Sequence, residues 1–253
     1  MTKSFYYTFF LSLFFVANVV AQPRVIAHRG YWDCEGAAQN SIASLNNSHK
    51  IGVYGSEFDV IQTSDDVLVV HHDASVDSML IEATPYSKLK NIKLSNGEKL
   101  PTLKEYLTQG KKNKGTQFIL EIKPHSTAEK ENKAVSAILN MVAKMKVESQ
   151  VEYISFSLNI CQELHRLNPK AKISYLKGDL DPEKIKELGF TGIDYNLKVL
   201  QKNINWIADA KKLGLTVNVW TVDSKKGMQE MIDNNVDFIT TNKPLVLKAL
   251  LNQ

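Results

Sequence analysis

Cysteines, glycine-rich loops and dense basic segments are scarce in this sequence of 253 residues. The two cysteines, Cys34 and Cys161, are too few for a disulfide framework, so we expect free thiols. No G-x-G-x-x-G or P-loop pattern is present, which argues against a nucleotide-binding fold. The net charge of +4 comes from scattered lysines, and the short run at 111–114 is typical of a solvated loop. We therefore expect no nucleic acid partner.

A long hydrophobic run occurs at the N-terminus and is not repeated later in the chain. Lys3 precedes an apolar segment from Phe5 to Val20, and small residues lead up to Ala21. This pattern predicts a signal peptide over residues 1–21, with an uncleaved anchor as the alternative. We expect an exported protein, periplasmic or secreted, without stable membrane insertion after cleavage. Residues 22–253 are expected to form one catalytic domain, and the sequence gives no signal for its oligomeric state.

Short β-branched runs alternate with amphipathic segments along the rest of the chain. The expected strands are Arg24–His28, Ser56–Ile61, Gln117–Ile122, Val151–Ser155, Lys172–Leu176, Gly192–Tyr195, Thr216–Thr221 and Asp237–Thr240. The expected helices are Ser41–Lys50, Leu103–Gly110, Ala128–Met145, Asn159–Asn168, Pro182–Leu188, Asn205–Leu213, Lys225–Asn234 and Pro244–Leu251. This regular alternation predicts a (β/α)₈ TIM barrel rather than an open, doubly wound sheet.

The chain after the second expected strand departs from this alternation. Ser64-Asp65-Asp66 has the composition of a turn, so Val67–His71 is expected to fold back as a short antiparallel hairpin. That hairpin would bring His72 opposite Asp59. Ala74–Leu100 is then expected to form a loop-rich excursion over the barrel mouth.

Three carboxylates stand at the ends of expected strands, where (β/α)₈ barrels carry their chemistry. Glu57 and Asp59 are two residues apart on one strand, so their side chains share a face, and Glu121 ends the next strand of the barrel. Three carboxylates in one barrel mouth repel each other unless a cation neutralises them. Because all the donors are oxygens, the pattern predicts one divalent ion, Mg²⁺ or Ca²⁺. Salt bridges to Arg29 and Lys123 are the alternative.

Two histidines and two cations accompany these carboxylates. His28 and His72 are candidates for the acid and the base of a phosphodiester cleavage, since imidazole titrates near neutral pH. Arg29 and Lys123 are candidates for binding the non-bridging phosphate oxygens. The set suits a metal-assisted phosphodiesterase acting on a small-molecule substrate.

Two further residues are candidates for binding the substrate. Asn40 could hydrogen-bond the site, or it could cap the helix that follows. Trp220, at the end of an apolar strand, could pack against a glycerol-sized group, although core packing is the usual role of such a residue. Tyr31 and Trp32 follow the His-Arg-Gly motif and could shape the pocket for the leaving group.

Together these motifs resemble the glycerophosphodiester phosphodiesterase family over nearly the whole chain after residue 21. The resemblance rests on Ala27-His28-Arg29-Gly30, Glu57-x-Asp59, His72-Asp73 after the hairpin, Glu121-x-Lys123, Ser155-Phe156, Val219-Trp220-Thr221 and the segment 236–244. It implies a TIM barrel that hydrolyses glycerophosphodiesters to glycerol 3-phosphate and an alcohol. It also implies that a neighbouring substrate hydroxyl attacks first, giving a cyclic phosphate that water then opens.

The same resemblance implies a role for each candidate residue. The metal ligands are Glu57, Asp59 and Glu121, the acid and base are His28 and His72, and the phosphate is bound by Arg29 and Lys123. The chain departs from the family at Ala38-Gln39-Asn40-Ser41, where Pro-Glu-Asn-Thr is usual, and at Thr241-Asn242, where Thr-Asp is usual. We expect these departures to touch neither the metal ligands nor the histidines, and to affect substrate preference alone.

Two other functions stay open on the sequence. A barrel phospholipase acting on intact or lyso-phospholipids would need an exposed apolar rim, for which Tyr31, Trp32 and Met79-Leu80-Ile81 are the candidates. An inactive barrel that binds phosphorylated ligands is the alternative from another class.

Overall fold

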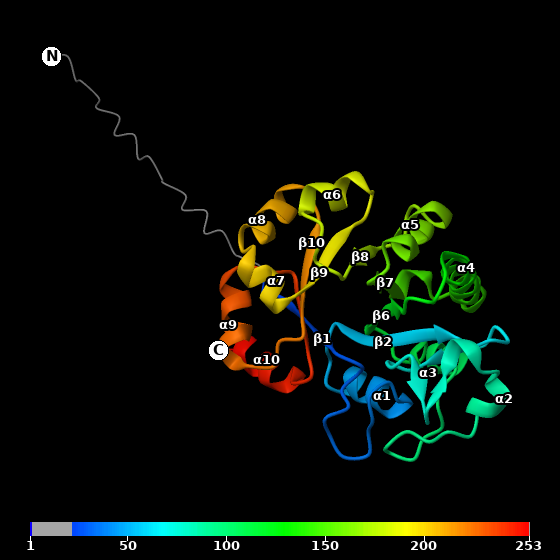
Figure 1. Cartoon of the computed structure of the whole chain (residues 1–253). Helices are drawn as coiled ribbons and strands as arrows, with labels where there is room; N and C mark the ends of the chain where they lie inside the picture. Colours follow the sequence, from blue (N-terminus) through cyan, green and yellow to red (C-terminus); the bar gives the residue numbers. More distant parts are fainter. Residues whose placement is uncertain (2–21, 253) are drawn as a thin grey trace.

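The computed structural model describes residues 22–252 together with Met1, so the expected signal peptide lies outside the described residues apart from Met1. Eight parallel strands form a closed barrel with the helices in a ring around it (Figure 1). The barrel strands are β1 (Arg24–Ala27), β2 (Gly55–Gln62), β6 (Gln117–Ile122), β7 (Val151–Ser155), β8 (Ile173–Tyr175), β9 (Gly192–Asn196), β10 (Thr216–Trp220) and β11 (Phe238–Thr241). Closure comes from β1, which pairs with both β2 and β11. The expected (β/α)₈ barrel is confirmed.

The outer ring contains all eight expected helices. They are α1 (Ile42–Lys50), α3 (Leu103–Gly110), α4 (Ala128–Met145), α5 (Leu158–Leu167), α6 (Pro182–Glu187), α8 (Asn205–Lys212), α9 (Lys225–Asp233) and α10 (Pro244–Leu251). A capping box between Thr102 and Glu105 starts α3, and the Asp181 side chain caps α6 at the backbone N–H of Lys184. A further short helix, α7 (Leu197–Lys202), was not expected.

The hairpin after β2 is present, one residue out of the expected register. Strand β3 (Leu68–Val70) lies antiparallel to β2, with Val60 opposite Val70. The backbone N–H of His71 therefore donates to the carbonyl of Asp59, at 3.0 Å. His71, and not His72, lies directly opposite Asp59, so the expected pairing was wrong by one position.

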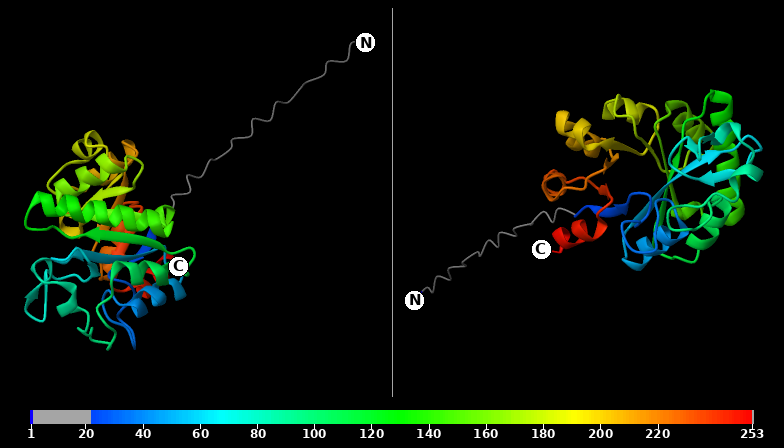
Figure 2. Two further views of the ribbon diagram at one scale, coloured as in Figure 1. Left: turned by 90° about the vertical axis from the view of Figure 1, so that its right-hand side faces the viewer. Right: turned by 60° about the horizontal axis from the view of Figure 1, so that its bottom comes forward.

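The excursion from Ala74 to Leu100 is better ordered than a plain loop. It contains β4 (Ser75–Val76), β5 (Met79–Leu80), a 3₁₀ turn η1 (Ile81–Ala83) and α2 (Tyr86–Leu89). These elements pack on a small apolar cluster of their own, formed by Ile61, Val69, Ile81, Leu89, Ile92 and Leu100. The excursion stands at one side of the barrel, while α4, the longest helix, lies along its outside (Figure 2).

The main apolar core fills the layer between the barrel and its helices. Both cysteines are free thiols, as expected. Among the described helices, none combines the length and the apolar character needed to cross a bilayer.

Candidate active site

The loop that leaves β1 is shaped by a tight backbone turn. Arg29 and Gly30 both have a left-handed conformation, with φ of 57° and 76°. A Cβ atom on Gly30 would lie 2.4 Å from Ser44 Oγ of α1, so only glycine fits against that helix. The turn aims the backbone N–H of Arg29 at Glu57, whose Oε2 accepts it at 2.7 Å. The His-Arg-Gly motif thus binds the loop to a carboxylate of β2.

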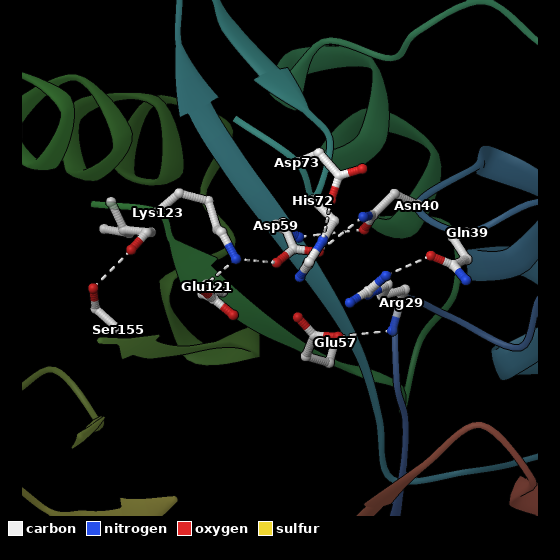
Figure 3. Close-up of polar contacts among 11 residues, drawn as sticks. Arg29, Gln39, Asn40, Glu57, Asp59, His72, Asp73, Glu121, Lys123 and Ser155 are labelled. Atoms are coloured by element: carbon white, nitrogen blue, oxygen red, sulfur yellow. Dashed lines mark hydrogen bonds and ion pairs between the residues drawn. The ribbon is translucent and has the colours of Figure 1, made fainter. Parts of the chain in front are cut away.

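Three carboxylates converge at the mouth of the barrel. Glu57 and Asp59 point inward from β2, and Glu121 points inward from β6, where it pairs with Asp59 in the sheet register. One oxygen from each of the three lies within 4.8 Å of the others, and all three side chains are buried (Figure 3).

A single ammonium group stands among these three acids. Lys123 Nζ lies 3.2 Å from Asp59 Oδ1 and 2.8 Å from Glu121 Oε1. Asn40, which also has a positive φ of 61°, donates from Nδ2 to Asp59 Oδ2 at 2.8 Å. The cap of α1 is instead Ser41, so of the two roles left open for Asn40 the structure shows the hydrogen bond to the site.

The carboxylates differ in how well the protein stabilises their charge. Burial, reinforced by the neighbouring acids, raises the pKa of Glu57 well above its usual value. Burial and then Asp59 raise the pKa of Glu121 to about 8, against the opposing effect of Lys123. Burial also works against the charge of Asp59, but Lys123 and His72 outweigh it and hold its pKa below the usual value. Of the three carboxyl groups, Asp59 alone is stabilised as a carboxylate, whereas Glu57 and Glu121 lack enough positive charge beside them to keep their usual pKa values.

This donor set fits a hard divalent cation. Carboxylate oxygens that face one another inside a protein are the ligands that Mg²⁺ and Ca²⁺ prefer. Asn40 and Lys123 hold Asp59 from two sides, and the Arg29 backbone holds Glu57, so the ligands are oriented before any ion binds. The cluster could hold a metal ion.

His28 directly follows β1 at the edge of this cluster, and a hydrogen-bond network behind it fixes its tautomer. Its Nδ1 lies 2.9 Å from Asn242 Oδ1, which also accepts the indole N–H of Trp32 at 3.2 Å. The Asn242 amide N–H in turn donates to Asp223 Oδ2 at 2.8 Å, so its oxygen must face His28. Because an amide oxygen only accepts, Nδ1 carries the proton and Nε2 is left unprotonated. Burial, followed by Arg29, lowers the pKa of His28 to about 4.

His72 comes from the loop after β3 and faces the cluster from the other side. Its Nδ1 lies 2.7 Å from Asp73 Oδ1, and its side chain is half-exposed. The bond to His72 lowers the pKa of Asp73, which keeps that partner ionised. Asp73 therefore orients His72.

Two cavities meet at Arg29 and His72. A small cavity of 130 Å³ lies in the barrel mouth, and His28, Glu57, Glu121 and Trp220 are among its lining residues. A larger one of 660 Å³ lies between the first loop and the excursion, and Trp32 is among its lining residues. Arg29 and His72 line both cavities. A substrate could thus place one part in the barrel and the other in the outer cavity.

The structure brings the sequence candidates together in one site. His28, Arg29, Glu57, His72, Glu121 and Trp220 line the barrel-mouth cavity, and Asn40, Asp59 and Lys123 join it through hydrogen bonds or ion pairs. The expectation that the departures from the family pattern touch none of the central groups was wrong. Asn242 bonds His28 directly, and Gln39 Oε1 accepts from Arg29 Nη1 at 2.5 Å.

Three residues near the site were given no role in it from the sequence, although Asn242 was noted as a departure from the family pattern. Asn242 and Asp223 form the network behind His28, and Asp194 on β9 lines the barrel-mouth cavity. Asn242 and Asp223 follow the carboxyl ends of β11 and β10, which was the available signal, whereas Asp194 is the middle residue of β9. That signal alone does not tell a cavity residue from a helix cap.

Comparison with known proteins gives one consistent family. The model of the "Glycerophosphoryl diester phosphodiesterase family" matches residues 28–246. A glycerophosphodiester phosphodiesterase of Caldanaerobacter subterraneus subsp. tengcongensis is 28% identical over 90% of this chain and 98% of its own length.

Solved structures agree with this match. A glycerophosphodiester phosphodiesterase from Parabacteroides distasonis has a TM-score of 0.91 and 52% identity, covering 91% of this chain and 97% of that one. An Oleispira antarctica phosphodiesterase, solved with the product sn-glycerol-3-phosphate, has a TM-score of 0.79 at 22% identity, covering 92% of this chain and 98% of that one. At that lower identity the likeness shows the shared fold.

Proposed function

Because the chain belongs to the glycerophosphoryl diester phosphodiesterase family, and is thus a phosphoric diester hydrolase, we propose that it converts glycerophosphodiesters to glycerol 3-phosphate and an alcohol with one bound divalent ion. The observation that carries the proposal is the convergence of three buried carboxylates with two imidazoles at one cavity. The Oleispira relative, which holds sn-glycerol-3-phosphate, supports the same product here.

The two histidines take opposite roles in the first step. His28, deep in the barrel with Nε2 unprotonated, removes the proton from the substrate hydroxyl next to the phosphate. That oxygen attacks phosphorus, and the bond to the departing alcohol breaks. His72, which lines the outer cavity, gives its proton to the departing oxygen. A cyclic phosphate and a free alcohol result.

The second step returns both histidines to their starting states. Water enters from the outer cavity and gives its proton to His72 as it attacks phosphorus. The ring opens at the oxygen that attacked first, and His28 returns the proton to that oxygen. Protons and charges balance over the two steps, and the products are glycerol 3-phosphate and the alcohol.

The remaining charged residues hold the phosphate and the ion. Arg29 and Lys123 bind the non-bridging oxygens and offset the charge that grows on them as the bond forms. Glu57, Asp59 and Glu121 would hold Ca²⁺ or Mg²⁺. When bound, the ion neutralises these carboxylates and supplies Lewis acidity to a phosphate oxygen.

Two further features of the proposal concern the place and the substrate of the enzyme. The N-terminal pattern supports export to the periplasm or the medium, and mass analysis of the mature N-terminus would test cleavage after Ala21. The apolar rim that a phospholipase needs is weak. Leu80 is exposed, but Met79, Tyr31 and Trp32 are only partly exposed, and Ile81 is buried. A small, water-soluble diester therefore suits this mouth better than a lipid.

The test is release of glycerol 3-phosphate from glycerophosphocholine, glycerophosphoethanolamine and glycerophosphoglycerol. We expect release that stops with EDTA and returns with Ca²⁺ or Mg²⁺. His28→Ala is the companion variant and is expected to lose activity. Equal hydrolysis by His28→Ala and the wild type would reject the acid/base roles, and no release with any metal would favour the ligand-binding barrel.

A further inference from the structure

Asp194 on β9 is a buried carboxyl group that the mechanism above does not use. Its side chain is 2% exposed. Among the described residues, its Oδ1 atom has no hydrogen-bond partner. A buried polar atom without a hydrogen-bond partner destabilises the fold, so a protein keeps one where another group, such as a ligand, satisfies it.

The position of Asp194 is at the floor of the barrel-mouth cavity. Together with Ile154 it lines both this cavity of 130 Å³ and a second one of 300 Å³ nearer the opposite end of the barrel. The two residues thus separate the site from the lower barrel interior. A ligand that fills the mouth cavity would contact the Asp194 carboxyl with its deepest atoms.

The sides of the cavity near this floor are apolar. Ile154, Phe156, Leu176 and Trp220 line it, and the rings of Phe156 and Trp220 meet edge to face with centroids 5.4 Å apart. The indole N–H of Trp220 donates to the backbone carbonyl of Asp194 at 2.9 Å. This bond ties the aromatic wall to the floor. The cavity thus combines apolar side walls with a polar group at its floor.

The protonation of Asp194 favours an uncharged ligand group beside it. Burial raises its pKa to about 7, and the neighbouring Asn218 side chain only partly opposes that effect. Near neutral pH a large fraction of the carboxyl is therefore neutral, able both to donate and to accept a hydrogen bond. A neutral floor also avoids repelling the phosphate bound above it.

We propose that Asp194 determines specificity by hydrogen-bonding the terminal hydroxyl of the glycerol unit, the one remote from the phosphate. This inference rests on the proposed function and deepens it. The substrates selected are diesters of a short polyol with a free end. A diester whose three-carbon unit ends in a methyl group leaves the carboxyl unpaired and is rejected.

The experiment compares two substrates that differ in this hydroxyl alone. One is glycerophosphoethanolamine, and the other is its analogue built on propane-1,2-diol 1-phosphate, which keeps the attacking hydroxyl. We expect the wild type to favour the glycerol substrate in kcat/KM by about tenfold or more, the usual effect of one buried hydrogen bond. In Asp194→Leu this ratio should fall to about one, mainly through loss on the glycerol substrate.

Two further variants keep the result interpretable. Asp194→Asn retains the volume and a hydrogen-bonding group, so it should keep part of the preference even if the leucine variant does not fold. Glu131→Gln changes another buried carboxyl, which accepts from Ser157 and Asn159 outside the barrel, and should leave the ratio unchanged. Thermal stabilisation by glycerol 3-phosphate, compared with propane-1,2-diol 1-phosphate, measures the same contact without turnover.

The outcomes separate this inference from the proposed function. An unchanged substrate ratio in a folded Asp194→Leu, or in Asp194→Asn if the leucine variant does not fold, would overturn the inference and leave water in the lower cavity as the partner of Oδ1. Absence of turnover in the wild type would reject the proposed function. A preference for glycerol 3-phosphate in the binding measurement that Asp194→Leu loses would still support the inference.

Discussion

The two ends of the barrel treat their carboxylates differently. At the N-terminal end, Glu152 accepts hydrogen bonds from the Tyr54 hydroxyl and from Lys172 Nζ, the latter at 2.8 Å. At the C-terminal mouth, two of the three buried carboxyl groups, Asp59 and Glu121, share Lys123, and Glu57 accepts only a backbone N–H among the described residues. The Glu152 charge at the rim is thus balanced by its neighbours, whereas at the mouth the surrounding side chains stabilise the charge of Asp59 and leave the pKa values of Glu57 and Glu121 raised.

The cations at the two ends differ in the same way. Arg24, at the rim, lies over the rings of Tyr54 and Phe238, 3.9 and 4.3 Å from their centroids. Arg29, at the mouth, lines two cavities and has one side-chain hydrogen bond, to Gln39. Arg24 at the rim is thus held between two aromatic rings. Arg29 at the mouth keeps hydrogen-bonding capacity for an anion, because its Nε has no partner among the described residues, and this capacity distinguishes the active site from the structural rim.

The largest expected effect comes from removing a charge at the mouth. Glu121→Gln should lower kcat/KM by more than about a hundredfold, because changes outside the direct ligands of a metal already cost about 10–100-fold. Steady-state hydrolysis of glycerophosphoethanolamine with added Ca²⁺ or Mg²⁺ measures it. Glu131→Gln, a buried carboxyl of α4, is the matched control and should retain activity. Equal activity in Glu121→Gln and the control would show that the carboxyl groups at the mouth do not differ in function from a buried carboxyl elsewhere in the fold.

The same variant should be less sensitive to pH in the metal-free protein. The pKa of Glu121 is raised in the folded state from 4.5 to about 8, so its contribution to stability is fully present below pH 4.5 and is lost as the pH rises from there to about 8. Urea unfolding in EDTA should show the wild type losing stability over that range more steeply than Glu121→Gln. If the stability of the two proteins depended on pH in the same way, the raised pKa of Glu121 would be contradicted.

An intermediate effect is expected behind His28. Asn242→Asp would place a carboxylate where an amide oxygen now lies 2.9 Å from Nδ1, and an adjacent carboxylate favours the protonated imidazole. The pKa of His28, now about 4, should rise, so the acid limb of the pH profile of kcat/KM should move up by about one to two units.

The control for this pH shift is Asn168→Asp, a new carboxylate at the end of α5 on the outer ring. It should leave the acid limb where it is in the wild type. An acid limb that does not move in Asn242→Asp would show that His28 is not the base, while a loss of kcat at every pH would indicate a structural role for Asn242.

The sequence carried most of this architecture because the signals were local. Short β-branched runs located the eight barrel strands, and the capping residues Thr102 and Asp181 located two helix starts. The contact between His28 and Asn242 joins residues 214 positions apart and exists because β1 pairs with β11. Asp194 stood in a strand of otherwise ordinary composition. Which of the inward-facing residues of a strand lines a cavity depends on how the barrel closes, so it cannot be predicted from the sequence of that strand alone.

The smallest effect is expected at the rim. Glu152→Gln should leave kcat/KM within about twofold and lower the free energy of unfolding by no more than about 1 kcal/mol, since its partner Lys172 is 62% exposed. Urea unfolding and a double-mutant cycle with Lys172→Gln measure the energy of that ion pair.

One electrostatic effect connects this rim to the mouth, because the charge of Glu152 contributes to the raised pKa of Asp194. Any effect of Glu152→Gln on hydrolysis should therefore change the ratio of kcat/KM between the glycerol and propanediol substrates. An equal loss of kcat/KM on both substrates would contradict this and show that the rim supports the catalytic residues themselves.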